Sequence, residues 1–107
     1  MYYGRLTIAQ ARHGQELHVA EIMDELAGLY RRQPGSIAQY SLNAGAIDPR
    51  VFKVGIWENK ESAGRAAQLV VSLRLRAQLL EYTEGHPEEL APNVTEDSGL
   101  GLESLVA

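Results

Sequence analysis

The spacing of apolar residues alternates between two periods along this chain, and the order of those periods restricts its fold more than any other feature. Apolar and polar residues alternate in residues 2–12, 36–43 and 51–58, which is typical of strands. In residues 15–33 and 60–83, apolar residues recur every three or four positions, which is typical of amphipathic helices. The sequence therefore predicts a strand, a helix, two strands and a second helix.

Residues that favour caps and turns stand at the predicted boundaries. Pro34 and Gly35 end the first helix, and Asn59 is a good N-cap for the second. The segment 44–50 contains Gly, Asp and Pro and predicts a short turn, so the two middle strands are expected to form an antiparallel hairpin. The apolar face of the second helix is predicted at Ala63, Ala66, Ala67, Val70, Leu73, Ala77 and Leu80.

The end of the chain predicts how the fold is completed. Residues 85–98 are polar and contain two prolines, so we interpret them as a connector that follows a core at residues 1–84. Residues 99–107 form a short, largely apolar run that predicts the last strand. The 107 residues are thus expected to form one domain with an α+β, ferredoxin-like βαββαβ fold and an antiparallel sheet.

Both faces of the predicted middle strands carry large side chains. In such a fold the helices cover one face of the sheet, and the other face meets water or a partner. The side chains concerned are Ala38, Tyr40 and Leu42 on one strand, and Phe52, Val54 and Ile56 opposite Lys53, Gly55 and Trp57 on the next. A second copy of the chain would cover the exposed face, so we predict a homodimer through the sheet faces.

Charge and composition exclude several classes of function. The formal net charge of -4 argues against nucleic-acid partners, because phosphate binding needs a cationic face. The absence of cysteine excludes disulfides and thiolate chemistry. No window approaches ~18 consecutive apolar residues, and the first residues are too polar for a signal peptide. We therefore expect a cytoplasmic protein without membrane partners.

The three histidines do not predict a metal site. His13 and His18 are five residues apart across a predicted turn, and His86 lies in the connector. We interpret all three as surface residues. The sequence also lacks a glycine-rich phosphate loop, so we expect neither a metal nor another cofactor.

Two stretches of the sequence resemble the antibiotic biosynthesis monooxygenase (ABM) family. In "RRQPGSIAQYSL" a Pro-Gly turn joins a helix to a strand, and in "VFKVGIWENKESAGRAAQ" a strand ends in Trp before a charged helix start. The resemblance covers about residues 4–82. It implies a dimeric α+β barrel with a pocket between helices and sheet in each subunit. It also implies cofactor-independent oxygenation of an aromatic, polyketide or quinone-like substrate.

The haem-degrading branch of that family uses an Asn on the first strand and a Trp and a His on the second helix. The matching positions of this sequence carry Thr7, Ala66 and Arg76. The resemblance therefore implies neither haem degradation nor a histidine base on the second helix.

Four residues are candidates for the lining of the implied pocket: Thr7, Tyr40, Trp57 and Arg76. Trp57 is either a pocket wall that stacks on a flat substrate or a scaffold residue packed against the second helix, and the resemblance favours the scaffold. Tyr40 is a candidate hydrogen-bond donor, although packing is the commoner role of a tyrosine.

Cofactor-free oxygenation needs a base, a group that holds the substrate anion, and a dry pocket. Arg5, Arg74 and Arg76 are candidates for holding the anion, although a surface ion pair is the commoner role of an arginine. Arg74 and Arg76 are two residues apart on a helix, so they cannot both face inward. The sequence identifies neither the base nor the substrate.

Three functions stay open from the sequence. The chain is a small oxygenase or isomerase acting on a polycyclic or quinone-like compound, a non-catalytic dimer that binds or senses a small hydrophobic or aromatic molecule, or a structural dimer whose cleft is filled by its own side chains. The small residues of "SAGRAA" fit a cavity and close packing equally well. The resemblance to the ABM family favours the oxygenase among these functions. The expected fold alone would not decide between them, because one fold can carry many functions.

Overall fold

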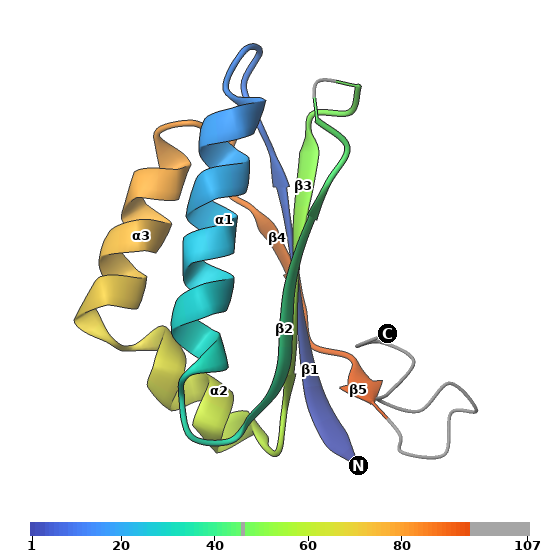
Figure 1. Ribbon diagram of the computed structural model, residues 1–107, viewed down its shortest axis with the longest axis vertical. Helices are drawn as coiled ribbons and strands as arrows, with labels where there is room; N and C mark the ends of the chain where they lie inside the picture. Colours follow the sequence, from blue (N-terminus) through green and yellow to red (C-terminus); the bar gives the residue numbers. More distant parts are fainter. Residues whose placement is uncertain (46, 95–107) are drawn as a thin grey trace.

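The computed structural model describes residues 1–45 and 47–94 (Figure 1). Within these residues, five strands and three helices follow in the order β1, α1, β2, β3, α2, α3, β4 and β5. Their bounds are Tyr2–Gln10, Glu16–Arg31, Ser36–Asn43, Arg50–Trp57, Lys60–Ala67, Val70–Leu80, Glu88–Leu90 and Asn93–Val94. The predicted α+β class and the predicted order of the first elements are confirmed.

All strand pairs of the described sheet are antiparallel. The strand order is β2-β3-β1-β4, and β5 also pairs with β1. β2 and β3 form the predicted hairpin. The three helices lie on one side of the sheet (Figure 1), so the ferredoxin-like arrangement is confirmed.

The core lies between the helices and the sheet. The buried side of α1 consists of Val19, Ile22, Met23, Leu26, Ala27 and Tyr30. Trp57, at the end of β3, is 2% exposed and meets Tyr30 edge to face, with ring centroids 5.8 Å apart. Ala63 and Ala66 of α2 belong to the same buried cluster. Since fully burying a side chain as large as Phe contributes roughly 1.5–3 kcal/mol, Trp57 is a major support of the fold.

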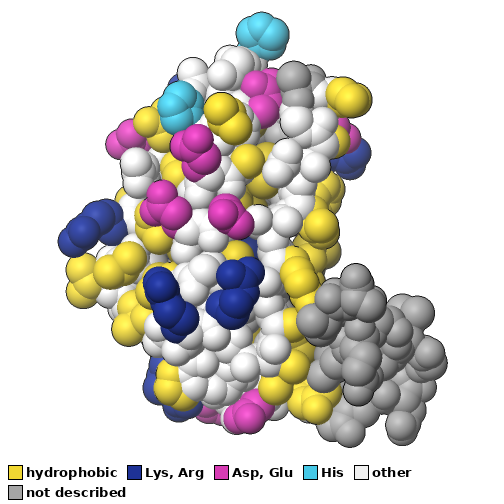
Figure 2. Space-filling model, in the orientation of Figure 1, with side chains coloured by type: hydrophobic (Ala, Val, Ile, Leu, Met, Phe, Trp, Pro, Cys, Tyr) yellow, Lys and Arg dark blue, Asp and Glu magenta, His cyan; other side chains and the backbone are white. Residues whose placement is uncertain are grey.

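The face of the sheet away from the helices is also apolar. The strand register aligns two rows across β1, β3 and β2, namely Leu6, Val54 and Tyr40, and Ile8, Phe52 and Leu42. Leu42 is 54% exposed in the single chain. Figure 2 shows hydrophobic side chains along the edge of the molecule where the sheet lies. We call these six residues the outer sheet face.

The prediction of one helix over residues 60–83 is wrong, because the chain breaks between α2 and α3. Leu69 is extended, with φ -60° and ψ 142°. The break lets α3 lie beside α1 (Figure 1). Tyr30 Oη of α1 and Ser72 Oγ of α3 form a hydrogen bond of 2.5 Å. Because Leu69 changes the phase of the helix, Leu75 and Leu79 are the buried leucines of α3, and the predicted Leu73 and Leu80 are partly exposed.

The predicted connector at residues 85–98 contains β4 and β5, which pair with β1 on the side opposite β3. The segment approaches β1 closely at Gly4, whose amide donates a 2.9 Å hydrogen bond to the carbonyl of Pro92. A Cβ at Gly4 would lie 2.8 Å from that oxygen, so the approach requires glycine. The strand predicted at residues 99–107 lies outside the described residues.

No helix in residues 1–45 and 47–94 combines the length and the hydropathy needed to cross a membrane.

Candidate functional site

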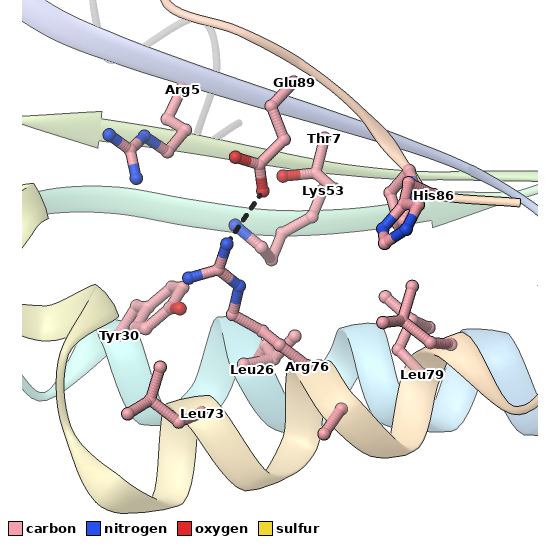
Figure 3. Close-up of a pocket in the computed structure, with 13 residues that line it drawn as sticks. Arg5, Thr7, Leu26, Tyr30, Lys53, Leu73, Arg76, Leu79, His86 and Glu89 are labelled. Carbon is pink, nitrogen blue, oxygen red and sulfur yellow. Dashed lines mark ion pairs between the residues drawn. The ribbon is translucent and has the colours of Figure 1, made fainter.

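A cavity of about 510 Å³ lies between the sheet and the helices α1 and α3 (Figure 3). Its volume falls in the range of small-molecule sites, ~300–1,000 Å³. The lining consists of Arg5, Thr7, Leu26, Tyr30, Lys53, Leu73, Arg76, Ala77, Leu79, Leu80, His86, Pro87 and Glu89. The helices contribute most of the apolar lining residues, whereas the sheet contributes most of the charged ones.

The helices supply an apolar wall. Leu26 and Tyr30 come from α1, one turn apart, and both belong to the buried face of that helix. The leucines of α3 that line the cavity include Leu73 and Leu80, which explains why these two are not packed in the core. A ligand with an apolar body therefore has a matching surface on this side of the cavity.

Three cations face the cavity, although the whole chain is acidic. Arg5 comes from β1, Lys53 from β3 and Arg76 from α3, and Glu89 of β4 is the one carboxylate in the described lining. Figure 3 shows Lys53 and Arg76 pointing toward Glu89. The distance from Arg76 Nη2 to Glu89 Oε1 is 3.8 Å, and both side chains are about two-fifths exposed, so this ion pair is weak. The cavity thus has an excess of positive charge in a protein of net charge -4.

Lys53 is the most unusual of these groups because it is 4% exposed and lies in the centre of the sheet. Thr7 is its partner across the strand pair, and its ammonium nitrogen lies 4.8 Å from the centroid of the Tyr30 ring. Burial lowers the pKa of Lys53 to about 8; the nearby Glu89 charge opposes this change, and Arg5 and Arg76 reinforce it.

The amine of Lys53 can be reached from the cavity. Within the described residues, no side chain forms an ion pair or a hydrogen bond with it. Among the described residues, Gln39 Oε1 is the only fully buried side-chain polar atom without a hydrogen-bond partner. The Lys53 nitrogen also lacks a partner, so it is not fully buried, and its accessible surface contacts the open space of the cavity.

The ring of Tyr30 is held from two sides. Its hydroxyl is paired with Ser72 of α3, and its ring packs against Trp57. Tyr30 in turn forms a wall of the cavity and contacts Lys53. Trp57 therefore supports the site from behind, as the scaffold interpretation expects.

The structure separates the four candidate pocket residues. Thr7 and Arg76 line the cavity, whereas Trp57 lies in the core and Tyr40 lies on the outer sheet face beside Val54. The prediction that Tyr40 and Trp57 line the pocket does not agree with this cavity. Both residues stand on strands with apolar side chains on either face, so alternation alone did not identify the face that the helices cover.

Among the candidate anion-holding residues, Arg5 and Arg76 reach the cavity, and Arg74 is exposed on α3. His86, interpreted as a surface residue, is exposed but stands at the border of the cavity. Sequence reasoning missed Lys53, Tyr30 and Glu89. The signal for Lys53 was a charged residue inside an apolar strand, on the same side as Trp57.

Within the described residues, no group of three or more histidine, aspartate or glutamate side chains could hold a metal ion.

Comparison with protein-family models and with curated proteins finds no match to this chain. Solved structures do match. A putative antibiotic biosynthesis monooxygenase from Nitrosomonas europaea has a TM-score of 0.81 at 12% identity, covering 92% of this chain and 94% of the other. SnoaB, a cofactor-independent oxygenase from Streptomyces nogalater, has a TM-score of 0.75 at 15% identity, covering 91% and 96%. A putative antibiotic biosynthesis monooxygenase from Chloroflexus aurantiacus has a TM-score of 0.70 at 18% identity, covering 89% and 96%.

These likenesses extend over nearly the full length of each chain. They agree with the topology and with the position of the resemblance in the sequence, at residues 4–82. The chain therefore has the fold of the antibiotic biosynthesis monooxygenases.

Proposed function

We propose that this chain is a monooxygenase that works without a cofactor on an aromatic, polyketide or quinone-like compound. The observation that carries the proposal is the buried amine of Lys53, placed with Arg5 and Arg76 opposite the apolar wall of the cavity. The fold supports it, because proteins of the same fold include one described as a cofactor-independent oxygenase.

The first step of such a reaction is removal of an acidic proton from the substrate. A base is most effective when its pKa lies near the working pH, and the pKa of Lys53 is about 8. The neutral amine accepts the proton and becomes an ammonium group. That charge, together with Arg5 and Arg76, stabilises the enolate or phenolate that forms, in surroundings where few water molecules compete.

The substrate anion then donates electrons to dioxygen. For an activated CH₂ group, one oxygen atom enters the substrate as a carbonyl, and the other leaves as water with both hydrogens. The substrate is oxidised and dioxygen is reduced, so no further reductant is needed. The role of the protein is to form the anion, hold it and exclude water.

We also propose that the chain acts as a homodimer through the outer sheet face. The six side chains of this face are apolar or aromatic and are not covered by the helices. A face of this composition is expected to be buried against another molecule. An identical copy offers a surface of matching size and chemistry.

Oxygen uptake tests the oxygenase proposal directly. The protein is mixed aerobically with anthrone-, quinol- and flavonol-type compounds, and oxygen and absorbance are followed. We expect uptake with at least one compound, loss of most of it in Lys53→Met, and no change in Lys60→Met, since Lys60 is exposed at the start of α2. Absence of uptake with every compound contradicts the proposal. Thermal stabilisation by one of them in that case supports the alternative of a non-catalytic dimer that binds or senses a small molecule.

A further inference from the structure

The chain has only two lysines, and the structure places them in opposite environments. Lys60 is exposed at the first position of α2, whereas Lys53 is buried in the sheet and faces the cavity. We propose that Lys53 is a nucleophile that forms an imine with aldehydes or ketones carrying an apolar body and an acidic group. This reaction is independent of oxygen and goes beyond the oxygenase function proposed above.

Imine formation needs a neutral amine that a carbonyl carbon can approach. Lys53 meets the second condition because its nitrogen contacts the open space of the cavity and, in the described residues, has no ion-pair or hydrogen-bond partner to displace. The Tyr30 ring lies on one side of the nitrogen, so a ligand approaches from the cavity.

The first condition follows from the groups around the amine. Burial and two cations, Arg5 on β1 and Arg76 on α3, disfavour the ammonium form, and Glu89 on β4 favours it. Desolvation and neighbouring cations are the usual means of activating a nucleophilic lysine. With a pKa of about 8, roughly a quarter of Lys53 is neutral at about pH 7.5, compared with about 0.1% of an ordinary lysine.

The chemical step is balanced without an oxidant or a reductant. The amine nitrogen attacks the carbonyl carbon and forms a carbinolamine. The C–O bond then breaks, and the oxygen leaves as water with the two hydrogens that the amine carried. A C=N bond joins Lys53 to the ligand, and hydrolysis reverses the reaction.

The lining defines the ligand class. Leu26, Leu73 and Leu80 offer contacts to a ring or an alkyl body, and the guanidinium groups of Arg5 and Arg76 offer donors to a carboxylate. A suitable probe is 4-carboxybenzaldehyde, and its methyl ester is the matched neutral compound.

Reductive trapping with cyanoborohydride tests the proposal, because it converts an imine into a stable amine. Native protein is treated at about pH 7.5 with the probe, without oxygen, and peptide mapping separates the adducts of Lys53, Lys60 and the amino terminus. We expect Lys53 to react at least tenfold faster than Lys60, and this preference to vanish in urea. Equal rates for the two lysines, or no adduct at Lys53, would overturn the proposal.

Two variants sharpen the result. Lys53→Met is expected to lose the fast adduct, whereas Lys60→Met keeps it. Arg76→Gln is expected to slow the reaction of the acid severalfold more than that of its methyl ester; an equal effect on both would show that the ligand class is wrong. Trapping and oxygen uptake are separate measurements, so either proposal can fail while the other stands.

Discussion

Replacing Lys53 by Met is expected to make the protein more stable at neutral pH, because the native fold holds this amine where its charge is disfavoured. Met has a similar length and no charge, and it suits a site bordered by Leu26 and Tyr30. The variant tests whether burial of the charged Lys53 side chain lowers the free energy of unfolding.

The magnitude follows from the pKa of Lys53, which falls from an ordinary 10.5 to about 8 on folding. At ~1.4 kcal/mol per pKa unit, the charged form costs about 3 kcal/mol of stability below pH 8. Loss of the contact between the ammonium and the Tyr30 ring offsets ~1 kcal/mol of the gain. The net gain of Lys53→Met at pH 7 is therefore about 2 kcal/mol, or ~10 °C in Tm for a domain of this size.

The pH dependence has a definite sign. Between pH 8 and 10.5 the unfolded chain keeps the Lys53 proton that the folded chain has released, so the stability of the native protein rises with pH in this window. The variant lacks this rise. Urea unfolding at several pH values from 7 to 10 measures both effects, and Lys60→Met is the control for loss of a lysine charge. A less stable Lys53→Met at pH 7, or parallel profiles for the two proteins, would refute the reasoning.

Three further predictions follow from other parts of the fold. Trp57→Ala is expected to lower the free energy of unfolding by about 3–5 kcal/mol in urea titrations, because Trp57 is fully buried, whereas Trp57→Phe keeps ligand affinity because the ring does not line the cavity. Gly4→Ala should push the Pro92 carbonyl away from β1 and increase hydrogen exchange of the Gly4 amide at least tenfold; unchanged exchange would show that the contact is not tight. Leu42→Lys should shift the proposed dimer to monomer in sedimentation experiments, while Leu17→Lys, which alters a still more exposed leucine on α1, should leave it intact.

Local sequence patterns predicted those elements whose limits are set by local chemistry. The Pro-Gly pair places the end of α1 near residue 33, and Asn59 accepts a 2.9 Å hydrogen bond from the Ser62 amide as an N-cap. The break at Leu69 was missed because neither proline nor glycine occurs there, and the cause is the packing of α3 beside α1. β4 was missed because its three residues do not alternate, and its pairing depends on the free edge of β1.

The site was less predictable than the fold, because it depends on which face of the sheet the helices cover. Thr7 and Arg76 were candidates only through the family resemblance, and both line the cavity. Tyr40 lies on the outer sheet face, away from this cavity, and the sequence did not distinguish the two faces because its strand carries side chains suited to either. The lowered pKa of Lys53 results from burial and from Arg5 and Arg76, which approach it from other elements. No local sequence pattern contains that information.

Glu89 stands on a three-residue strand at the edge of the sheet, yet it supplies the carboxylate that partly balances the cations of the cavity. An acidic ligand that takes over Arg76 competes with this side chain for the same guanidinium. Because the ion pair is weak and β4 is held by its pairing with β1, such a ligand can displace the Glu89 side chain while the strand stays in place. The preference of the cavity for charged or neutral ligands can change through this edge alone, without any change in the buried residues between the helices and the sheet.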